Sequence, residues 1–275
     1  MTDLRQTANY AQYLQSSGWL VEKTDNTYIF IRKIPLTPFS IIKVQRPEKI
    51  PFATISQLAK KHHTLAVYFE PLTTKQTILA SQHGFRLSKS PYLPTKTLTL
   101  DLKQSEEKIL AQMKKDCRYA IKKAQNSSLQ IIEVADLEKL HRVWKKSVNW
   151  QRYVPSFKNL QRLKKAFGKN ALFLQANPPA GGSIAGTVIL IAKKTAYYYY
   201  AFSSKTGRKV LAQYLLVWQA IKEAKKAGCQ IFDFEGIYDK RFSNKSWLGF
   251  SHFKKSFGGK EVEYPGCFVN SRLRR

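Results

Sequence analysis

The sequence predicts a mixed α/β fold, and two patterns support this prediction. Strand-like and helix-like segments alternate along both halves of the 275-residue chain. The clearest run has a strand at residues 197–202, a long helix at 210–227 and a second strand at 229–234. A strand, a helix and a strand in this order form a βαβ unit, so we expect these two strands to be neighbours in one sheet.

Helical periodicity defines the long helix of that unit. Apolar residues recur at helical spacing, namely Leu211, Tyr214, Leu215, Trp218 and Ile221. Lysines crowd the last turn, where cations suit the helix dipole, and Gly228 closes the helix. One face of this helix should therefore be buried against the sheet.

In the first half, β-branched runs alternate with helical patterns. The strands are expected at 28–34, 41–45, 64–69 and 97–102, and the helices at 4–16, 56–62 and 73–83. Pro35 and Pro38 lie in the connection between the first two strands, and Gly84 ends the third helix. These elements give the first half an α/β order of its own.

A further helix is predicted over 105–126. Ser105 is a suitable N-cap, and Glu106 with Glu107 fills the first turn. The apolar stripe runs through Ile109, Leu110, Met113, Cys117, Ala120, Ile121 and Ala124, and the opposite face carries Lys114, Lys115, Arg118, Lys122 and Lys123. Like charges four residues apart cost a few tenths of a kcal/mol, which an anionic partner would relieve. A solvated basic face is the alternative.

The polar residues 126–128 mark the best internal boundary. After them we expect a strand at 129–134, helices at 136–150 and 156–167, a strand at 172–175 and a hairpin of 184–192 with 195–202. Both halves thus show mixed α/β order, which indicates two similar subdomains.

Charge is the strongest compositional signal. Lys and Arg number 47 against 18 Asp and Glu, giving a net charge of +29. This excess favours polyanionic partners, namely RNA, DNA, nucleotide-linked substrates or an anionic membrane face. A lysine-rich solvated surface is the alternative reading.

Other function classes find no support in the composition. Cys117, Cys229 and Cys267 are far apart and form no CxxC or CxxH pair, so neither a disulfide framework nor a zinc site is indicated. The five histidines show no metal-ligand or catalytic-triad spacing. No apolar run reaches membrane-spanning length and the N-terminus lacks a signal-peptide core, so we expect a soluble, cytoplasmic protein and a monomer.

Several short motifs follow one another in a fixed order. They are Gln15-Ser16-x-x-Trp19-x-x-x-Lys23, Gly84-Phe85, Asp101-Leu102, Met113-Lys114, Arg118-Tyr119-x-x-Lys122-Lys123-Ala124, Tyr214-Leu215-Leu216-x-Trp218, Asp233-Phe234-x-Gly236-Ile237, Phe253-Lys254-x-x-Phe257-Gly258-Gly259 and Val262-Glu263-Tyr264-x-Gly266. In this order and spacing they resemble the Fem family of aminoacyl-tRNA-dependent transferases, in the GNAT superfamily. The chain departs from the family pattern at Arg46-Pro47, which lacks the glycine of the family's Arg-Gly-Pro, and it has no heptad stretch for a coiled-coil arm.

The resemblance implies a specific organisation and reaction. It implies tandem GNAT-like domains, the first at 1–128 plus about 260–275 and the second at 129–259. It implies an enzyme that transfers an amino acid from aminoacyl-tRNA to a stem-peptide amine of a peptidoglycan precursor, lipid II or UDP-MurNAc-pentapeptide. No cofactor beyond the aminoacyl-tRNA co-substrate, and no metal, is expected. The basic surface also suits peripheral contact with the anionic inner face of the plasma membrane.

The resemblance also suggests site residues. Lys254 is the first catalytic candidate, as a phosphate-binding or charge-stabilising lysine; Glu235 and Asp101 are weaker ones, with structural carboxylates as the alternative. The candidates for binding substrate are Lys23, Arg152, Tyr200, Tyr214 and Phe253, and those for binding tRNA are Arg118 and Lys122. The alternative for each basic residue is a solvated surface side chain, and for each aromatic residue it is a core side chain.

Two other functions stay open at this point. An acyl-CoA-dependent GNAT enzyme needs a glycine-rich pyrophosphate loop, and the corresponding loop, 203–210, has one glycine. Another aminoacyl-tRNA transferase, acting on protein N-termini or a lipid, would share that feature. A non-catalytic RNA-binding protein fits the charge, but no RNA-recognition, KH or zinc-knuckle pattern is present.

Overall fold

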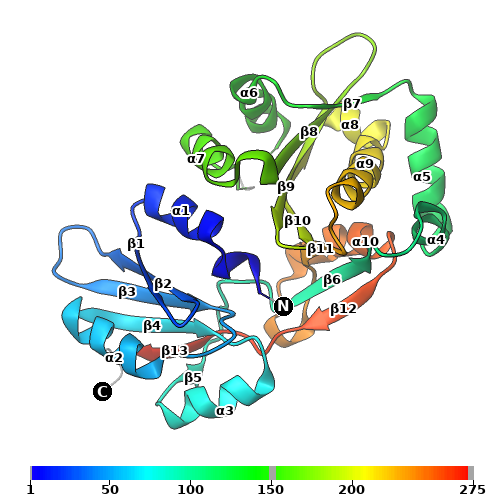
Figure 1. Ribbon diagram of the computed structural model, residues 1–275. Coiled ribbons are helices and arrows are strands. Elements are labelled where there is room, and N and C mark those ends of the chain that lie inside the picture. Colours follow the sequence, from blue (N-terminus) through cyan, green and yellow to red (C-terminus); the bar gives the residue numbers. More distant parts are fainter. Residues whose placement is uncertain (1, 149–152, 272–275) are drawn as a thin grey trace. The chain divides into compact units, whose positions relative to one another are not determined.

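The computed structural model describes residues 2–148 and 153–271, and these form two compact units. The first unit comprises Met1–Thr97, Tyr238–Lys245 and Val262–Arg275, and the second comprises Leu98–Ile237 and Ser246–Glu261. The chain thus leaves the first unit and returns to it twice. Figure 1 shows the elements of both units.

The first unit is built on a six-stranded sheet of order β1-β2-β3-β4-β13-β5. Its strands are β1 (Leu20–Thr24), β2 (Thr27–Lys33), β3 (Ser40–Gln45), β4 (Thr64–Glu70), β5 (Arg86–Leu87) and β13 (Phe268–Ser271). Strand β3 runs parallel to β4, and the other pairs are antiparallel. The C-terminal strand therefore lies between two strands from the first hundred residues. The hydrophobic core of the first unit is formed by Ile29, Ile31, Ile42, Val44 and Phe69 with their neighbours.

Three α-helices and a short 3-10 turn from the first hundred residues accompany this sheet. They are η1 (Leu4–Gln6), α1 (Ala8–Ser16), α2 (Phe52–Lys61) and α3 (Thr74–Gln82). Helix α3 starts with a capping box, in which the Thr73 side chain accepts from the backbone N–H of Gln76 and the Gln76 side chain accepts from that of Thr73.

The second unit is built on a seven-stranded sheet of order β12-β6-β11-β10-β9-β8-β7. Its strands are β6 (Lys96–Asp101), β7 (Gln130–Glu133), β8 (Ala171–Asn177), β9 (Ala185–Ala192), β10 (Thr195–Ser203), β11 (Ile231–Gly236) and β12 (Lys260–Glu263). Strands β10 and β11 pair in parallel, with α9 (Ala212–Lys226) between them in sequence. The predicted βαβ unit is confirmed.

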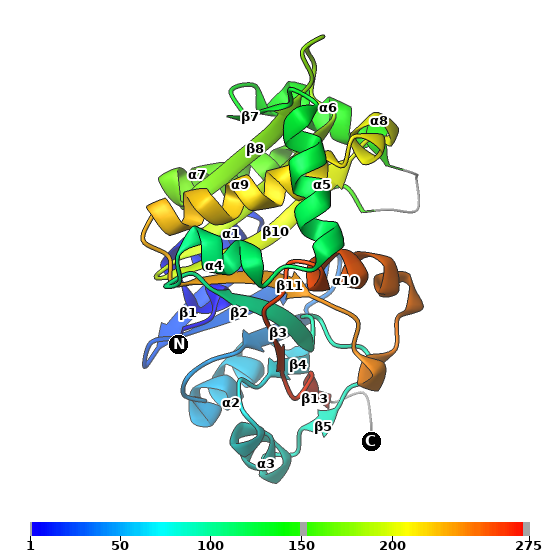
Figure 2. The same ribbon diagram turned by 90° about the vertical axis from the view of Figure 1, so that its right-hand side faces the viewer.

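The remaining helices belong to the second unit. They are α4 (Glu106–Ala111), α5 (Lys115–Asn126), α6 (Leu137–Ser147), α7 (Phe157–Phe167), α8 (Lys205–Lys209) and α10 (Leu248–Lys255), with 3-10 turns η2 (Gly168–Asn170) and η4 (Lys245–Trp247). Helix α5 packs across α9, as Figure 2 shows. Helix α9 supplies the centre of the core, where Leu216, Val217, Ala220 and Ile221 are fully buried. The 3-10 turn η3 (Lys240–Phe242) lies in the first unit.

The single helix predicted over 105–126 is wrong, because the chain breaks at residues 112–114. The backbone N–H of Lys114 donates to Ser256 O over 2.8 Å, and Arg118 Nη1 donates to the carbonyl oxygen of Met113. These two bonds replace helical ones, so α4 and α5 are separate. The apolar stripe continues across the break, which is why the sequence pattern reads as one helix.

The division into compact units also differs from the expected domain boundary at 128. Residues 98–128 belong to the second unit, because α5 packs on α9 and β6 joins the larger sheet. The residues 238–245, expected in the second domain, belong to the first unit.

Candidate functional site

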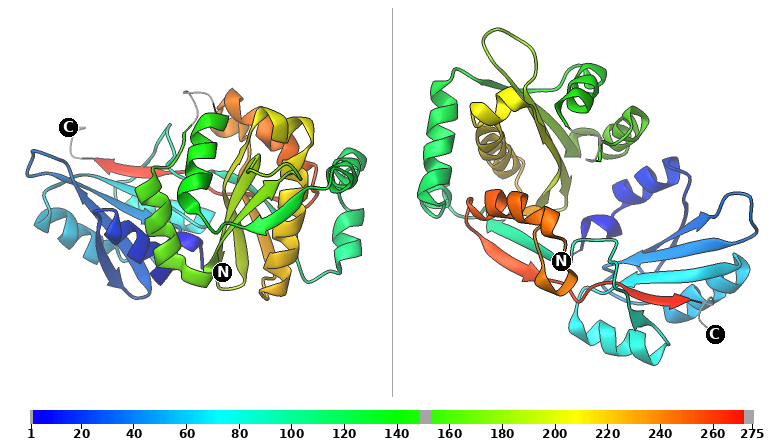
Figure 3. Two further views of the ribbon diagram at one scale, coloured as in Figure 1. Left: turned by 90° about the horizontal axis from the view of Figure 1, so that it is seen from above. Right: turned by 180° about the vertical axis from the view of Figure 1, so that it is seen from behind.

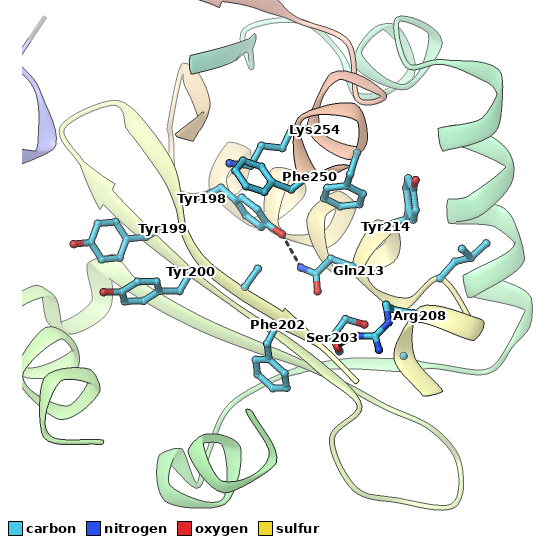
Figure 4. Close-up of a pocket in the computed structure, with 14 residues that line it drawn as sticks. Tyr198, Tyr199, Tyr200, Phe202, Ser203, Arg208, Gln213, Tyr214, Phe250 and Lys254 are labelled. Atoms are coloured by element: carbon cyan, nitrogen blue, oxygen red, sulfur yellow. Dashed lines mark hydrogen bonds between the residues drawn. The ribbon is translucent and has the colours of Figure 1, made fainter. Parts of the chain in front are cut away.

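A pocket of about 430 Å³ opens in the second unit beside the C-terminal half of β10. Its walls come from β10, α8, the start of α9 and α10 (Figure 4). It is lined by Tyr198, Tyr199, Tyr200, Ala201, Phe202, Ser203, Gly207, Arg208, Leu211, Gln213, Tyr214, Phe250, Phe253 and Lys254. Half of these fourteen residues are aromatic, so the pocket favours a flat or apolar ligand group.

A bulge in β10 directs three consecutive tyrosines to the pocket. The pairing of β10 with β9 shifts between Tyr198 and Tyr200, which breaks the simple alternation that the sequence predicted for 197–200. Thr187 Oγ1 donates to the backbone oxygen of Tyr200 over 2.9 Å and secures the strand just after the bulge. Tyr198 is buried, whereas Tyr199 and Tyr200 are half-buried.

Close backbone packing sets the position of α8 at the pocket edge. A Cβ atom at Gly207 would lie 2.5 Å from the backbone oxygen of Ile184, so only glycine fits there. The chain then turns at Leu211, whose φ of 57° is left-handed, and α9 starts one residue later. The helix expected at 210–227 is therefore α9 alone, with α8 as a separate turn of basic residues in front of it.

Lys254 lies in the wall of the pocket with only 8% of its surface exposed. Its Nζ donates to the carbonyl oxygen of Gly236 over 2.6 Å and lies 5.1 Å from the ring centre of Phe250. Burial lowers the pKa of Lys254 to about 8, against the attraction of the nearby carboxylates Glu235 and Asp233. The side chain is thus a desolvated cation facing aromatic rings, held by one hydrogen bond.

Four aromatic rings support the helix that carries this lysine. Tyr214 packs edge-on against Phe253 at 4.8 Å and stacks on Phe257 at 5.8 Å, and Phe257 meets Phe234 at 5.4 Å. Phe257 is fully buried. The apolar positions of the Phe-Lys-x-x-Phe motif therefore anchor α10 to α9 and β11, and the lysine between them points to the pocket (Figure 4).

The two carboxylates near Lys254 come from the end of β11. Asp233 is buried, and its Oδ1 accepts from the backbone N–H of Glu235 over 2.7 Å. Glu235 is half-buried with a left-handed φ of 58°. Neither lines the pocket, so they act on Lys254 through their charge.

Gln213 adds a polar group to the otherwise aromatic wall. Its Nε2 donates to the Tyr198 hydroxyl over 2.8 Å, which fixes the amide. Its Oε1 is buried and accepts no hydrogen bond within the described residues. A buried oxygen without a donor is unfavourable, and a ligand N–H would satisfy it after a small movement.

The structure brings four of the predicted residues together. Lys254, Tyr200, Tyr214 and Phe253 all line the pocket. The other ten lining residues were not among the predicted site residues, and they include Gln213, Arg208 and Phe250. Phe250 stands four residues before Lys254, a helical spacing that could have indicated it, whereas no sequence signal distinguishes Gln213 or Arg208.

The other predicted residues lie elsewhere. Asp101 is exposed at the end of β6, where its Oδ1 accepts from the backbone N–H of Lys103 over 2.9 Å. Lys23 is exposed on β1 in the first unit, with Nζ 5.4 Å from the Tyr28 ring centre. Arg118 caps α4 through the carbonyls of Met113 and Ala111, and Lys122 is exposed on α5. Arg152 lies outside the described residues.

Arg46, which follows β3, is buried in the first unit and contacts other residues of that unit. Its guanidinium pairs with Asp3 at 3.0 Å, donates to Pro94 O at 2.6 Å and stacks 3.5 Å from the Tyr264 ring centre. The side chain is 3% exposed. These contacts tie the N-terminus, the β3 end and the C-terminal segment of this unit together.

Over residues 2–148 and 153–271, no three His, Cys, Asp or Glu side chains gather as a metal site would require. Among the helices in the same ranges, none is long and apolar enough to cross a bilayer.

Comparison with solved structures gives several matches along the whole chain. FemX matches with a TM-score of 0.83 and 14% identity, covering 98% of this chain and 92% of that one. L-PGS from Bacillus licheniformis matches with a TM-score of 0.65 and 12% identity, over 94% and 86% of the two chains. A tandem GNAT protein from the clavulanic acid biosynthesis pathway matches at 0.60 and 10%, over 94% and 87%. The fold is therefore the tandem GNAT fold that the sequence predicts.

Sequence comparisons point to one family. The sequence model of the FemAB family matches residues 156–271, a stretch that includes β10, α9 and the Lys254 motif. A comparison with curated protein sequences gives no significant match. Members of the FemAB family are enzymes that transfer amino acids from aminoacyl-tRNA. Over residues 156–271 the chain is thus similar to the FemAB family, and its fold is similar to that of FemX.

Proposed function

We propose that this enzyme transfers an amino acid from aminoacyl-tRNA to the side-chain amine of the stem peptide in a peptidoglycan precursor, forming a peptide cross-bridge. The acceptor is lipid II or UDP-MurNAc-pentapeptide. The family match supports the proposal, and the observation that carries it within the structure is Lys254, a buried cation in the wall of an aromatic pocket.

The pocket suits the charged 3′ end of a tRNA. Aromatic side chains stack on nucleobases of any sequence, and Tyr214, Phe250 and Phe253 offer such faces. Gln213 adds an acceptor oxygen and a second amide hydrogen, the pair with which glutamine reads adenine. The basic residues Lys205, Arg208 and Lys209 of α8 are exposed beside the pocket, where the preceding phosphates would lie.

Lys254 would supply the electrostatic part of the reaction. The ester of an aminoacyl-tRNA is already activated, so the protein has to align the attacking amine with the carbonyl carbon and stabilise the oxyanion that forms. An ammonium group in a desolvated wall interacts more strongly with a developing negative charge than one in water does. The attacking amine forms the C–N bond and loses a proton, the C–O bond of the ester breaks, and the 3′ oxygen of the tRNA departs as a hydroxyl that has gained a proton.

The remaining site assignments are part of the same proposal. Glu235 would tune the charge of Lys254, and Asp101 remains a weaker catalytic candidate. Lys23 and Arg152 would bind the diphosphate of the precursor, and Lys122 would meet tRNA phosphates. Arg118, which caps α4, would act on tRNA only through its remaining charge.

A reconstituted transfer reaction tests this function. Purified protein is incubated with total tRNA charged with labelled amino acids and with lipid II or UDP-MurNAc-pentapeptide in parallel. We expect label in one of the muropeptides and release of uncharged tRNA. Tight tRNA binding with no transfer to either acceptor would contradict the proposal.

A further inference from the structure

We propose that the loop between β2 and β3, residues 34–39, is a docking element for anionic lipid bilayers. This inference goes beyond the transfer reaction, and it rests on the apolar tip, the fixed backbone and the basic surroundings of that loop. Figure 3 shows the loop projecting beyond the strand ends of the first unit's sheet.

The tip of the loop is apolar and exposed. Leu36 is fully exposed at 106%, and Phe39 is 40% exposed, with Pro35 and Pro38 exposed beside them. None of residues 34–39 is charged. Leu20, 45% exposed, belongs to the same end of the sheet, because it pairs with Ile31 two residues before the end of β2. The exposed apolar side chains thus lie at one end of the strands.

Hydrogen bonds within the loop hold this tip in place. The backbone N–H of Ile34 donates to Phe39 O over 2.9 Å, and Thr37 Oγ1 donates to Ile34 O over 3.0 Å. Leu36 has a left-handed φ of 61°, which is unfavourable for a residue with a Cβ atom. The loop therefore presents a leucine to solvent in a preformed shape, and little ordering entropy is lost on insertion.

Basic side chains surround the tip. Arg32 and Lys33 precede the loop, and Lys60 and Lys61 end α2; all four are exposed. Because β4 runs parallel to β3 and Thr64 pairs with Ser40, the end of α2 lies at the same end of the strands as the loop. Glu48 is the only acidic residue from Thr27 to Phe69.

This combination fits a bilayer surface better than a protein groove. A small apolar tip inserts among headgroups, while cations around it attract anionic lipids, and the two contributions together give stable peripheral binding. A protein groove would require a broader apolar face than the narrow tip of this loop. A bilayer-bound enzyme would also have direct access to a lipid-linked acceptor.

Vesicle co-sedimentation tests the proposal. The full chain is mixed with vesicles of phosphatidylcholine alone or with about a third phosphatidylglycerol. We compare wild type with Leu36→Asp, and we use Ile78→Asp as the matched control, since Ile78 is 60% exposed on α3 in the same unit. We expect anionic vesicles to bind wild type at least tenfold more tightly than neutral ones. Leu36→Asp should lose most of that binding and Ile78→Asp should keep it.

A fluorescent label provides a second readout. The three native cysteines are buried, so Leu36→Cys adds one exposed thiol for an environment-sensitive dye, with Ile78→Cys as control. A blue shift on anionic vesicles is expected at position 36 only. Equal binding to both vesicle types, or equal shifts at both positions, would overturn the proposal. Transfer to UDP-MurNAc-pentapeptide without lipid should be unchanged in Leu36→Asp, which separates this inference from the transferase reaction.

Discussion

Lys254 and Gly236 are joined by a 2.6 Å hydrogen bond from the ammonium Nζ to the backbone oxygen. Gly236 is the last residue of β11, and Lys254 lies near the end of α10, so the bond links two elements whose sequence motifs are separated by a loop. The bond orients the only charge that the described part of α10 brings to the pocket wall. The function proposed for the chain depends on this arrangement.

The lowered pKa of Lys254 limits the pH range of catalysis. The cation is present below pH 8 and is lost above it, because burial lowers its pKa to about 8. An acceptor amine with a pKa of about 10 becomes more reactive as pH rises. The transfer rate should therefore increase with pH and level off near pH 8. Initial rates from pH 6 to 10, corrected for spontaneous ester hydrolysis, measure this, and an increase that continues to pH 10 would contradict it.

Gly259, the last residue of the Phe-Lys-x-x-Phe-Gly-Gly motif, should be required for the stability of the fold. Its φ is 97°, and an added Cβ would lie 2.5 Å from Thr99 O and 2.8 Å from Leu100 Cδ2. Gly259→Ala is expected to lower the free energy of unfolding by about 2 kcal/mol or more. At Gly249, in α10, an added Cβ would have nothing within 4 Å. Gly249→Ala should therefore raise the free energy of unfolding by about 0.5–1 kcal/mol, because alanine favours the helix. Urea denaturation measures both, and equal effects would refute the structural role.

Arg118 and Lys122 lie on the same face of α5 but should behave differently. Arg118→Met removes the cap on α4 and is expected to cost about 1 kcal/mol of stability. Lys122→Met should leave stability unchanged and weaken tRNA binding. The slope of the logarithm of the binding constant against the logarithm of salt concentration should become shallower by about one, because one counterion fewer is released. Filter binding at several salt concentrations provides the measurement. If Lys122→Met binds tRNA as wild type does, α5 does not meet the RNA.

Asp239 should set an acid limit for the first unit. Burial alone would raise the pKa of Asp239, but hydrogen bonds from Arg241 and Thr95 lower it to about 2. A lowered carboxyl pKa gives stability that is present above about pH 4 and is lost as pH falls toward 2. Asp239→Asn should thus lower the free energy of unfolding by about 1–2 kcal/mol at pH 7. It should also reduce the fall of the melting temperature as pH decreases from about 4 to 2. The exposed Glu22→Gln serves as control, and an unchanged acid limb in Asp239→Asn would count against this role.

Periodicity predicted the elements better than it predicted their ends. Tyr214, Leu215 and Trp218 identify α9 because a buried helix face repeats along the sequence. The break before Lys114 was missed because its cause is a hydrogen bond to Ser256, which is distant in sequence. Helix α8 was missed for the same kind of reason, since Gly207 packs against Ile184 of another segment.

The candidate site was predicted in part. Lys254 and Tyr214 were found because each lies in a motif whose order along the chain resembles a family. Gln213 and Arg208 were not found, because their significance comes from the direction of their side chains across a turn with a left-handed residue, Leu211. A carboxylate such as that of Asp101 is a common catalytic group. In the structure, however, it accepts a hydrogen bond from the backbone N–H of Lys103 in a local turn.

The most direct test compares two neighbouring lysines in the transfer reaction. Lys254→Met removes the buried cation, and Lys255→Met removes a half-buried one, which pairs with Glu261. We predict that Lys254→Met lowers kcat at least a hundredfold, as loss of an oxyanion-stabilising group does, while Lys255→Met stays near wild type. Circular dichroism and urea unfolding would verify that both variants are folded. Equal transfer rates for wild type and a folded Lys254→Met would contradict the proposed role of the pocket.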